Sequence, residues 1–268
     1  MQAYKSTFSV HIYLALSWPR SLLIIVLGSV LFAGCTALHR PIETEEDIAR
    51  RFLPAPRSVP HPDSLSSVHL YRSSEGLSVE MDTTFGAIWK HWSSGPQQRQ
   101  GVNIAEADDY TSFATLRSRE MRLAVLNRAT PLSTYPVGQA DSVLHERVEQ
   151  PYSEEVAFDV YMYTYGAQAR LANLNTTSRV FLKTDSGTLH EPVRIEHGRL
   201  GRRTGTRRTR NASQVVYRRN RIVFERHTEE EGDLLDSSRL EVHIRTTNPI
   251  SAFSFEWELP TDSTLARE

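Results

Sequence analysis

A period-two alternation of apolar and polar residues, which begins near Glu155, limits the fold of this chain more narrowly than any other feature. The alternation is visible in Phe158–Tyr163 and is cleanest in Leu240–Ile244 and Phe253–Leu259, where apolar side chains alternate with Glu, His or Ser. Half-buried antiparallel strands produce this pattern. Ile222–Glu225 is a further short strand candidate. We therefore expect an antiparallel β-sandwich or open barrel over residues 149–260.

One hairpin of this region can be placed from its turn residues. Arg179–Lys183 and Leu189–Ile195 read as strands on either side of Thr184–Thr188. Gly187 can adopt the left-handed conformation that a short hairpin loop requires. The sequence predicts that these two strands pair.

Residues 67–148 form a mixed, more helical region. Val68–Tyr71 and Leu77–Met81 alternate like short strands on either side of a Ser-Ser-Glu-Gly turn. A helix is expected next, because apolar residues recur on one helical face after a capping threonine, Thr83 or Thr84. The residues of that face are Phe85, Ile88, Trp89 and Trp92. Such a stripe is typical of core packing.

The following segment has two interpretations. Ala105–Leu126 reads as a longer helix with Phe113, Leu116, Leu123 and Leu126 facing inward, whereas the alternation within Met121–Val125 would also suit a strand. With the strands downstream, the fold class is α+β and mainly β, with a smaller helical region before the C-terminal sheet structure.

The chain divides into five parts by composition. Residues 1–34 read as a leader, 35–66 as a tether, 67–148 and 149–260 as the regions described above, and 261–268 as a tail. Within the tether, Pro41–Phe52 suits a short helix that Thr44 caps. Leu53–Pro62 contains four prolines, which favours a solvated polyproline spacer over a ligand for a proline-reading module.

Cys35, the only cysteine of the chain, stands directly after a short apolar run. Leu22–Ala33 is shorter than the about 20 apolar residues of a membrane-spanning helix and suits the hydrophobic part of a signal peptide. Lys5 and Arg20 supply positive charge before it, and no acidic residue precedes Glu43. A single cysteine also excludes an intramolecular disulfide, so core packing must stabilise the fold.

The segment Leu31-Phe-Ala-Gly-Cys35 resembles the lipobox of bacterial lipoproteins. The resemblance covers the leader alone. It implies cleavage before Cys35, attachment of lipid (palmitate among the acyl chains) to this residue, and a place in the cell envelope. Thr36 after the cysteine implies the outer membrane in a cell with two membranes. The alternative is a plain secretory signal or an anchor with an incidental cysteine.

The mature region carries no catalytic or metal-binding signature. A Gly-x-Ser-x-Gly elbow, a phosphate-binding glycine loop and a His-Glu-x-x-His motif are all missing from the sequence, and the histidines, His243 among them, have no ligand spacing. Asp108–Asp109 and Glu229–Asp233 suit solvated loops. We therefore expect no cofactor, no metal and no enzymatic activity. A pair of carboxylates brought together by folding would still permit a hydrolase.

Nine arginines and no acidic residue occur from Arg199 to Arg221. Gly201–Arg210 reads as a loop between strands, and arginine forks pair well with phosphate. The candidate anion-binding residues are Arg202, Arg203, Arg207, Arg208 and Arg210. The alternative is a solvated loop whose charge the acidic run from Glu229 balances. Nucleic acid is not expected in an envelope compartment.

Three functional hypotheses follow. The leading one is a non-catalytic envelope lipoprotein, held at the membrane by its N-terminal lipid, that acts as an interaction or assembly module for an envelope protein. The first alternative is a protein that binds anionic lipid head groups or polysaccharides through the arginine-rich segment. The second is an envelope hydrolase.

Overall fold

A computed structural model gives the fold of this chain. The chain separates into two units, Met1–Thr44 and Glu45–Glu268, and the described residues all belong to the second. The structure describes residues 58–74, 76–98, 110–165, 174, 178–198, 201–204, 214–247 and 250–260. The leader, Cys35, the helix expected at Pro41–Phe52 and the tail lie outside these residues.

The larger sheet is antiparallel and has the strand order β10-β11-β6-β5-β3, with β9 also pairing with β11. Its longest ladder joins β6 to β11, from Glu155 opposite Glu225 to Tyr165 opposite Val215. The strands are β3 (Ser93–Ser94), β5 (Tyr110–Leu116), β6 (Glu155–Tyr165), β9 (Arg194–His197), β10 (Gly201–Thr204) and β11 (Gln214–Glu225).

The second sheet has the order β4-β15-β14-β7-β8 and is also antiparallel. Its strands are β4 (Gln97–Gln98), β7 (Ser178–Thr184), β8 (Leu189–His190), β14 (Arg239–Thr247) and β15 (Ile250–Glu258). Two hairpins stand apart from the sheets. They are β1 (Val68–Ser73) with β2 (Gly76–Met81), and β12 (His227–Thr228) with β13 (Gly232–Asp233).

The two sheets pack face to face through large apolar side chains. The ring of Phe158 on β6 lies 4.8 Å from that of Trp257 on β15 and 6.0 Å from that of Phe224 on β11. Leu240 and Val242 on β14 are fully buried beside them. The sheets do not close into a barrel, and the expected α+β, mainly β class with an antiparallel sandwich is confirmed.

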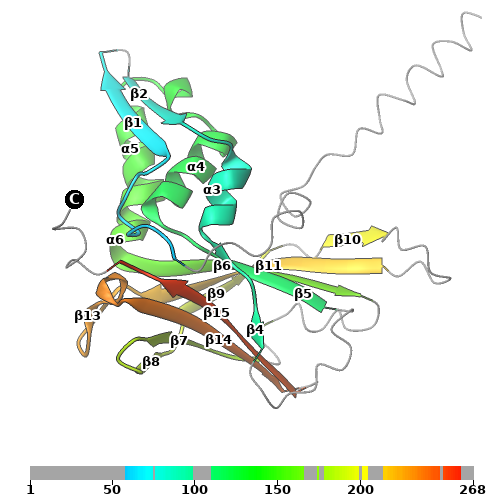
Figure 1. Ribbon diagram of the computed structural model, residues 1–268. Coiled ribbons are helices and arrows are strands. Elements are labelled where there is room, and N and C mark those ends of the chain that lie inside the picture. The colour runs from blue at the N-terminus through cyan, green and yellow to red at the C-terminus, as the bar shows by residue number, and fades with distance from the viewer. Residues whose placement is uncertain are drawn as a thin grey trace, which may run out of the picture. The chain divides into compact units, whose positions relative to one another are not determined.

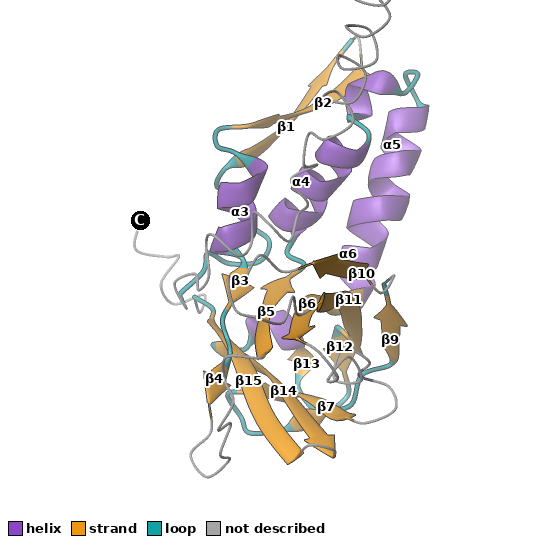
Figure 2. Cartoon of the chain, turned by 90° about the vertical axis from the view of Figure 1, so that its right-hand side faces the viewer, coloured by secondary structure: helices purple, strands orange, loops and turns teal. Residues whose placement is uncertain are grey.

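Helices cover the other face of the larger sheet, whose middle strands lie between the helices and β14–β15 in both Figure 1 and Figure 2. Trp89 joins helix α3 (Phe85–His91) to this face of the sheet. Its ring packs on Phe113 of β5 and Tyr161 of β6, and its indole N–H donates to Thr115 Oγ1 at 2.8 Å. The helical elements are α3 (Phe85–His91), α4 (Arg119–Ala129), η2 (Leu132–Thr134), α5 (Gln139–Leu144), the π-helical η3 (His145–Glu149), α6 (Gln150–Glu154) and η5 (Leu234–Asp236).

Several local predictions are confirmed. Thr84 caps α3 by accepting from the Ala87 amide, and Ile88 and Trp89 are buried on the expected face. The first hairpin pairs Val68–Ser73 with Gly76–Met81. The β7–β8 turn places Gly187 at φ 91°, as a short hairpin loop requires.

The expected helix over Ala105–Leu126 is wrong in its described first half. Tyr110–Leu116 is strand β5, and the helix begins only at Arg119, after Ser118, whose Oγ accepts from the Met121 amide. The alternative strand at Met121–Val125 is also wrong, because these residues lie within α4. One core therefore includes residues from both 67–148 and 149–260, since β5 pairs with β6.

Three further predictions need correction. The strand expected over Leu189–Ile195 is two strands, because β8 ends at His190 and β9 begins at Arg194 in the other sheet. The loop expected at Gly201–Arg210 begins as strand β10, which pairs with β11. The described end of the proline spacer is not solvated. Val59 is buried, and its amide donates to Glu258 O at 3.2 Å.

Candidate functional site

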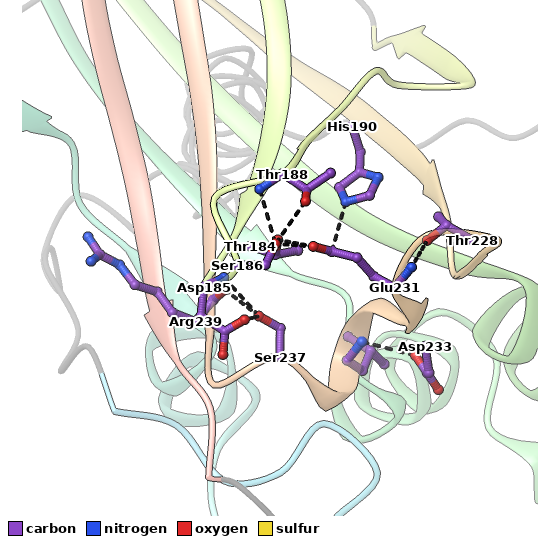
Figure 3. Close-up of polar contacts among 11 residues, drawn as sticks. Thr184, Asp185, Ser186, Thr188, His190, Thr228, Glu231, Asp233, Ser237 and Arg239 are labelled. Atoms are coloured by element: carbon purple, nitrogen blue, oxygen red, sulfur yellow. Dashed lines mark hydrogen bonds and ion pairs between the residues drawn. The ribbon is translucent and has the colours of Figure 1, made fainter.

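A cluster of hydroxyl groups surrounds Glu231 where the β12–β13 hairpin meets the β7–β8 turn (Figure 3). Ser186 Oγ donates to Glu231 Oε1, and Thr184 Oγ1 donates to the same oxygen at 3.0 Å. On the other carboxylate oxygen, Oε2, His190 Nε2 lies at 3.0 Å. Thr228 Oγ1 accepts from the Glu231 amide at 3.2 Å. One carboxylate thus joins two hairpins that are far apart in sequence.

These contacts keep the Glu231 carboxylate ionised. Burial on its own would raise the pKa of Glu231, but the hydrogen bonds from Ser186, Thr188, His190 and Thr184 lower the pKa to about 2. An ionised carboxylate only accepts hydrogen bonds. At neutral pH Glu231 therefore acts as a fixed acceptor and has no proton to donate to a substrate.

Asp185 holds the other side of the same turn. Its Oδ2 accepts from the Ser238 amide at 2.9 Å, and its Oδ1 accepts from Ser237 Oγ at 2.9 Å. The hydrogen bond from the Ser238 side chain and those from the Ser238 amide and Ser237 lower the pKa of Asp185. Two carboxylates therefore fix the turn between β7 and β8 from opposite sides.

A hollow of about 490 Å³ lies beside this cluster, between β8 and the β12–β13 hairpin. Four glutamates line it, and no lysine or arginine does. Two apolar side chains in its lining are unusually exposed, Leu189 at 57% and Val193 at 62%. The lining residues are Leu189, His190, Glu191, Val193, Glu225, His227, Thr228, Glu229 and Glu230.

The lining of the hollow is acidic and partly apolar. It combines negative charge with exposed apolar surface, so a ligand with cationic and apolar groups would be complementary to it. Within the described ranges, no group of three or more His, Cys, Asp or Glu side chains is placed to hold a metal ion. His190, the histidine nearest to the cluster, is held by Glu231.

The candidate anion-binding and lipidation residues that the sequence singled out lie elsewhere or outside the described residues. Arg202 and Arg203 lie on β10, opposite Val216 and Val215 of β11. The structure does not describe Cys35, Arg207, Arg208 or Arg210. Contact of the arginine-rich segment Arg199–Arg221 with anionic surfaces stays a prediction. No helix in the described part of the chain is long and apolar enough to cross a bilayer.

Sequence reasoning missed the Glu231 cluster and the hollow. The expectation that Glu229–Asp233 is a solvated loop is wrong for Glu231, which Thr184, Ser186 and His190 hold, and for Asp233, which pairs with Arg226 at 2.7 Å. The hydroxyl-rich turn Thr184–Thr188 and the acidic run from Glu229 are both visible in the sequence. Their contact depends on how the β12–β13 hairpin packs against the second sheet, which periodicity does not fix. Comparisons with known protein families, with curated proteins and with solved structures find no match for this chain.

Proposed function

We propose that this protein is a non-catalytic lipoprotein of the bacterial cell envelope, and that its β-sandwich domain docks a basic, partly apolar segment of an envelope protein. The observation that carries the docking proposal is the hollow beside β8, with its glutamate-rich lining and the exposed Leu189 and Val193. An isolated exposed apolar residue is ordinary on a protein surface. Two of them in one acidic hollow favour a binding surface.

Charge and apolar contact would contribute differently to binding. The carboxylates of Glu229 and Glu230 are exposed, so they would steer and orient a cationic segment while adding modestly to affinity. Burial of Leu189 and Val193 against the partner would supply the hydrophobic part. The Glu231 cluster would keep the walls of the hollow in place, so little ordering free energy is lost on binding.

The membrane attachment rests on the sequence around Cys35. Several acyl chains at the N-terminus would anchor the protein stably, because each buried methylene contributes about 0.8 kcal/mol and one chain alone is marginal. The lipid would hold the domain at the membrane, where envelope partners are concentrated. Acylation would also remove the only thiol from any reaction.

A direct test uses a short fluorescent peptide of alternating leucine and arginine as the probe, with the protein in nonionic detergent and binding followed by anisotropy. Replacing Glu229 and Glu230 by glutamine should weaken binding about twofold to thirtyfold, as two exposed ion pairs predict. The matched control is Glu80→Gln with Glu146→Gln. It removes the same charge from exposed positions outside the hollow and should bind like the wild type.

The apolar half of the proposal has its own variant. Val193→Ser should weaken binding of the leucine–arginine peptide. A peptide of alternating leucine and glutamate should bind neither the wild type nor this variant. Equal affinity of the Glu229/Glu230 variant and the Glu80/Glu146 control would overturn the assignment of the hollow as the docking site.

A further inference from the structure

A second cluster of charged side chains lies on the opposite face of the larger sheet from the sandwich core. Asp159 on β6 forms its centre, and its side chain is 4% exposed. Arg221, its partner across the ladder on β11, and Arg117, directly after β5, both contact it. Arg122 reaches the cluster from helix α4, where its Nε donates to Arg117 O at 3.1 Å. The sequence showed Arg221 as the last member of the arginine run, but it gave no sign that Arg221 meets Asp159, Arg117 and Arg122, which lie far from it along the chain.

The described part of the cluster contains fewer acceptors than its guanidinium groups require. Asp159 accepts from Arg221 Nε at 2.9 Å and from Arg117 Nη1 only at 3.5 Å. Arg117 Nε and Arg122 Nη2 are buried and have no hydrogen-bond partner among the described residues. A buried donor without a partner is costly, and the cost is larger for a charged group.

The carboxylates near the cluster also carry too little negative charge to balance its arginines. Glu196 Oε2 lies 3.9 Å from Arg221 Nη1 and its side chain is 46% exposed, while Glu155 already pairs with Arg194 at 2.8 Å. Burial and the repulsion of Arg117 and Arg221 lower the pKa of Arg122 to about 10. Burial likewise lowers the pKa of Arg117, although Asp159 opposes this effect. Three buried or half-buried guanidiniums thus share one buried carboxylate.

We propose that this cluster is a binding site for a phosphate-type oxyanion. Such an anion offers acceptor oxygens for Arg117 Nε and Arg122 Nη2 and adds negative charge to that of Asp159, and guanidinium forks match it geometrically. Arg221 is 29% exposed and the neighbouring Arg219 is exposed, so the β11 side of the cluster is the side that solvent reaches. The anion would enter there. This site is separate from the acidic hollow and does not depend on the docking proposal.

The first experiment measures inorganic phosphate binding to the full-length protein by calorimetry and thermal unfolding, against chloride at equal ionic strength. We expect one phosphate per chain and, at a concentration one hundred times Kd, a rise in Tm of about 5–10 °C over chloride. A chloride effect equal to the phosphate effect would overturn the proposal, since it would reflect ionic strength alone.

Variants show whether the arginine cluster is responsible. Arg219→Gln, at the exposed edge, should fold normally and weaken phosphate binding severalfold. Arg122→Gln should weaken it about tenfold or more. Its Tm without phosphate is measured as the baseline, because the loss of the bond to Arg117 O and the relief of charge repulsion act in opposite directions. Arg72→Gln is the control, because Arg72 is 68% exposed and pairs with Asp141 on the helical side. A phosphate-dependent rise in Tm that is as large in both cluster variants as in the wild type would contradict the proposal.

The same chemistry could come from a soluble phosphate or from a lipid head group. Glycerol 3-phosphate and vesicles containing phosphatidylglycerol separate these sources. Tight binding of soluble phosphate that vesicles do not alter would identify the soluble anion. Vesicle binding that inorganic phosphate displaces would identify the head group. Vesicle binding that phosphate cannot displace, with no effect of soluble phosphate, would refute the site.

Discussion

Replacing Glu231 by glutamine tests the carboxylate that joins the β7–β8 turn to the β12–β13 hairpin. The amide keeps the size of the side chain but removes the charge, and it places an N–H₂ group where hydroxyl donors now converge. His190 loses its carboxylate partner as well. We expect the variant to fold and to have a lower free energy of unfolding at pH 7.

The magnitude follows from the pKa of Glu231, which lies at about 2 in the folded protein and at 4.5 for the free side chain. That difference would correspond to at most about 3 kcal/mol at a fully buried site. The cluster lies near the surface, where solvent screens the interactions, so about 1–2 kcal/mol is a realistic loss. Because the folded-state pKa is the lower one, this stabilisation is present above pH 4.5 and is lost as the pH falls from 4.5 towards 2.

Urea denaturation of wild type and Glu231→Gln at a series of pH values between 7 and 2.5 measures this difference. The gap between the two unfolding free energies should be constant above about pH 5 and should shrink steadily below it. Glu230→Gln, the exposed neighbour in the same turn, should stay close to wild type throughout. Equal stability of wild type and Glu231→Gln at pH 7, or a gap that does not shrink in acid, would refute the reasoning.

Two remaining predictions concern the N-terminus and the arginine-rich segment. Metabolic labelling with an alkyne-tagged fatty acid should mark the wild type and leave Cys35→Ala unlabelled; equal labelling of both would exclude Cys35 as the lipidation site. Replacing four arginines of the arginine-rich segment by serine should abolish salt-sensitive binding to anionic vesicles. Unchanged affinity, or no binding by either form, would show that this segment is not a polyanion contact. The four residues are Arg202, Arg203, Arg207 and Arg208.

The sequence predicted best those strands that have one buried and one polar face. In β14, Leu240, Val242 and Ile244 point into the sandwich core, so the alternation was plain. Strand β5 was misread because Ser112 to Leu116 are buried on both faces, one under the helices and one in the core. A short run without alternation cannot be distinguished from part of a buried helix.

Neither charged site could be derived from the sequence. Glu231 and its partner Thr184 are 47 residues apart, and Arg221 and Asp159 are 62 apart. The first pair forms only when the β12–β13 hairpin packs against the end of β7, and the second only when the strand order places β11 beside β6. The arginine run was visible, yet its last member, Arg221, turned out to be an ion-pair partner of a buried aspartate. Charge patterns alone do not separate these roles.

Site-specific photocrosslinking in intact envelopes tests the docking proposal most directly. A photoreactive residue at position 193, in the hollow, should form one main adduct, and the crosslinked segment of the partner should carry lysine or arginine beside apolar residues. Val137 is the matched control, because it is a valine of similar exposure, 69% against 62%, outside the hollow. The account predicts that position 137 gives no such adduct. The same adduct from both positions, or an acidic crosslinked segment, would contradict it.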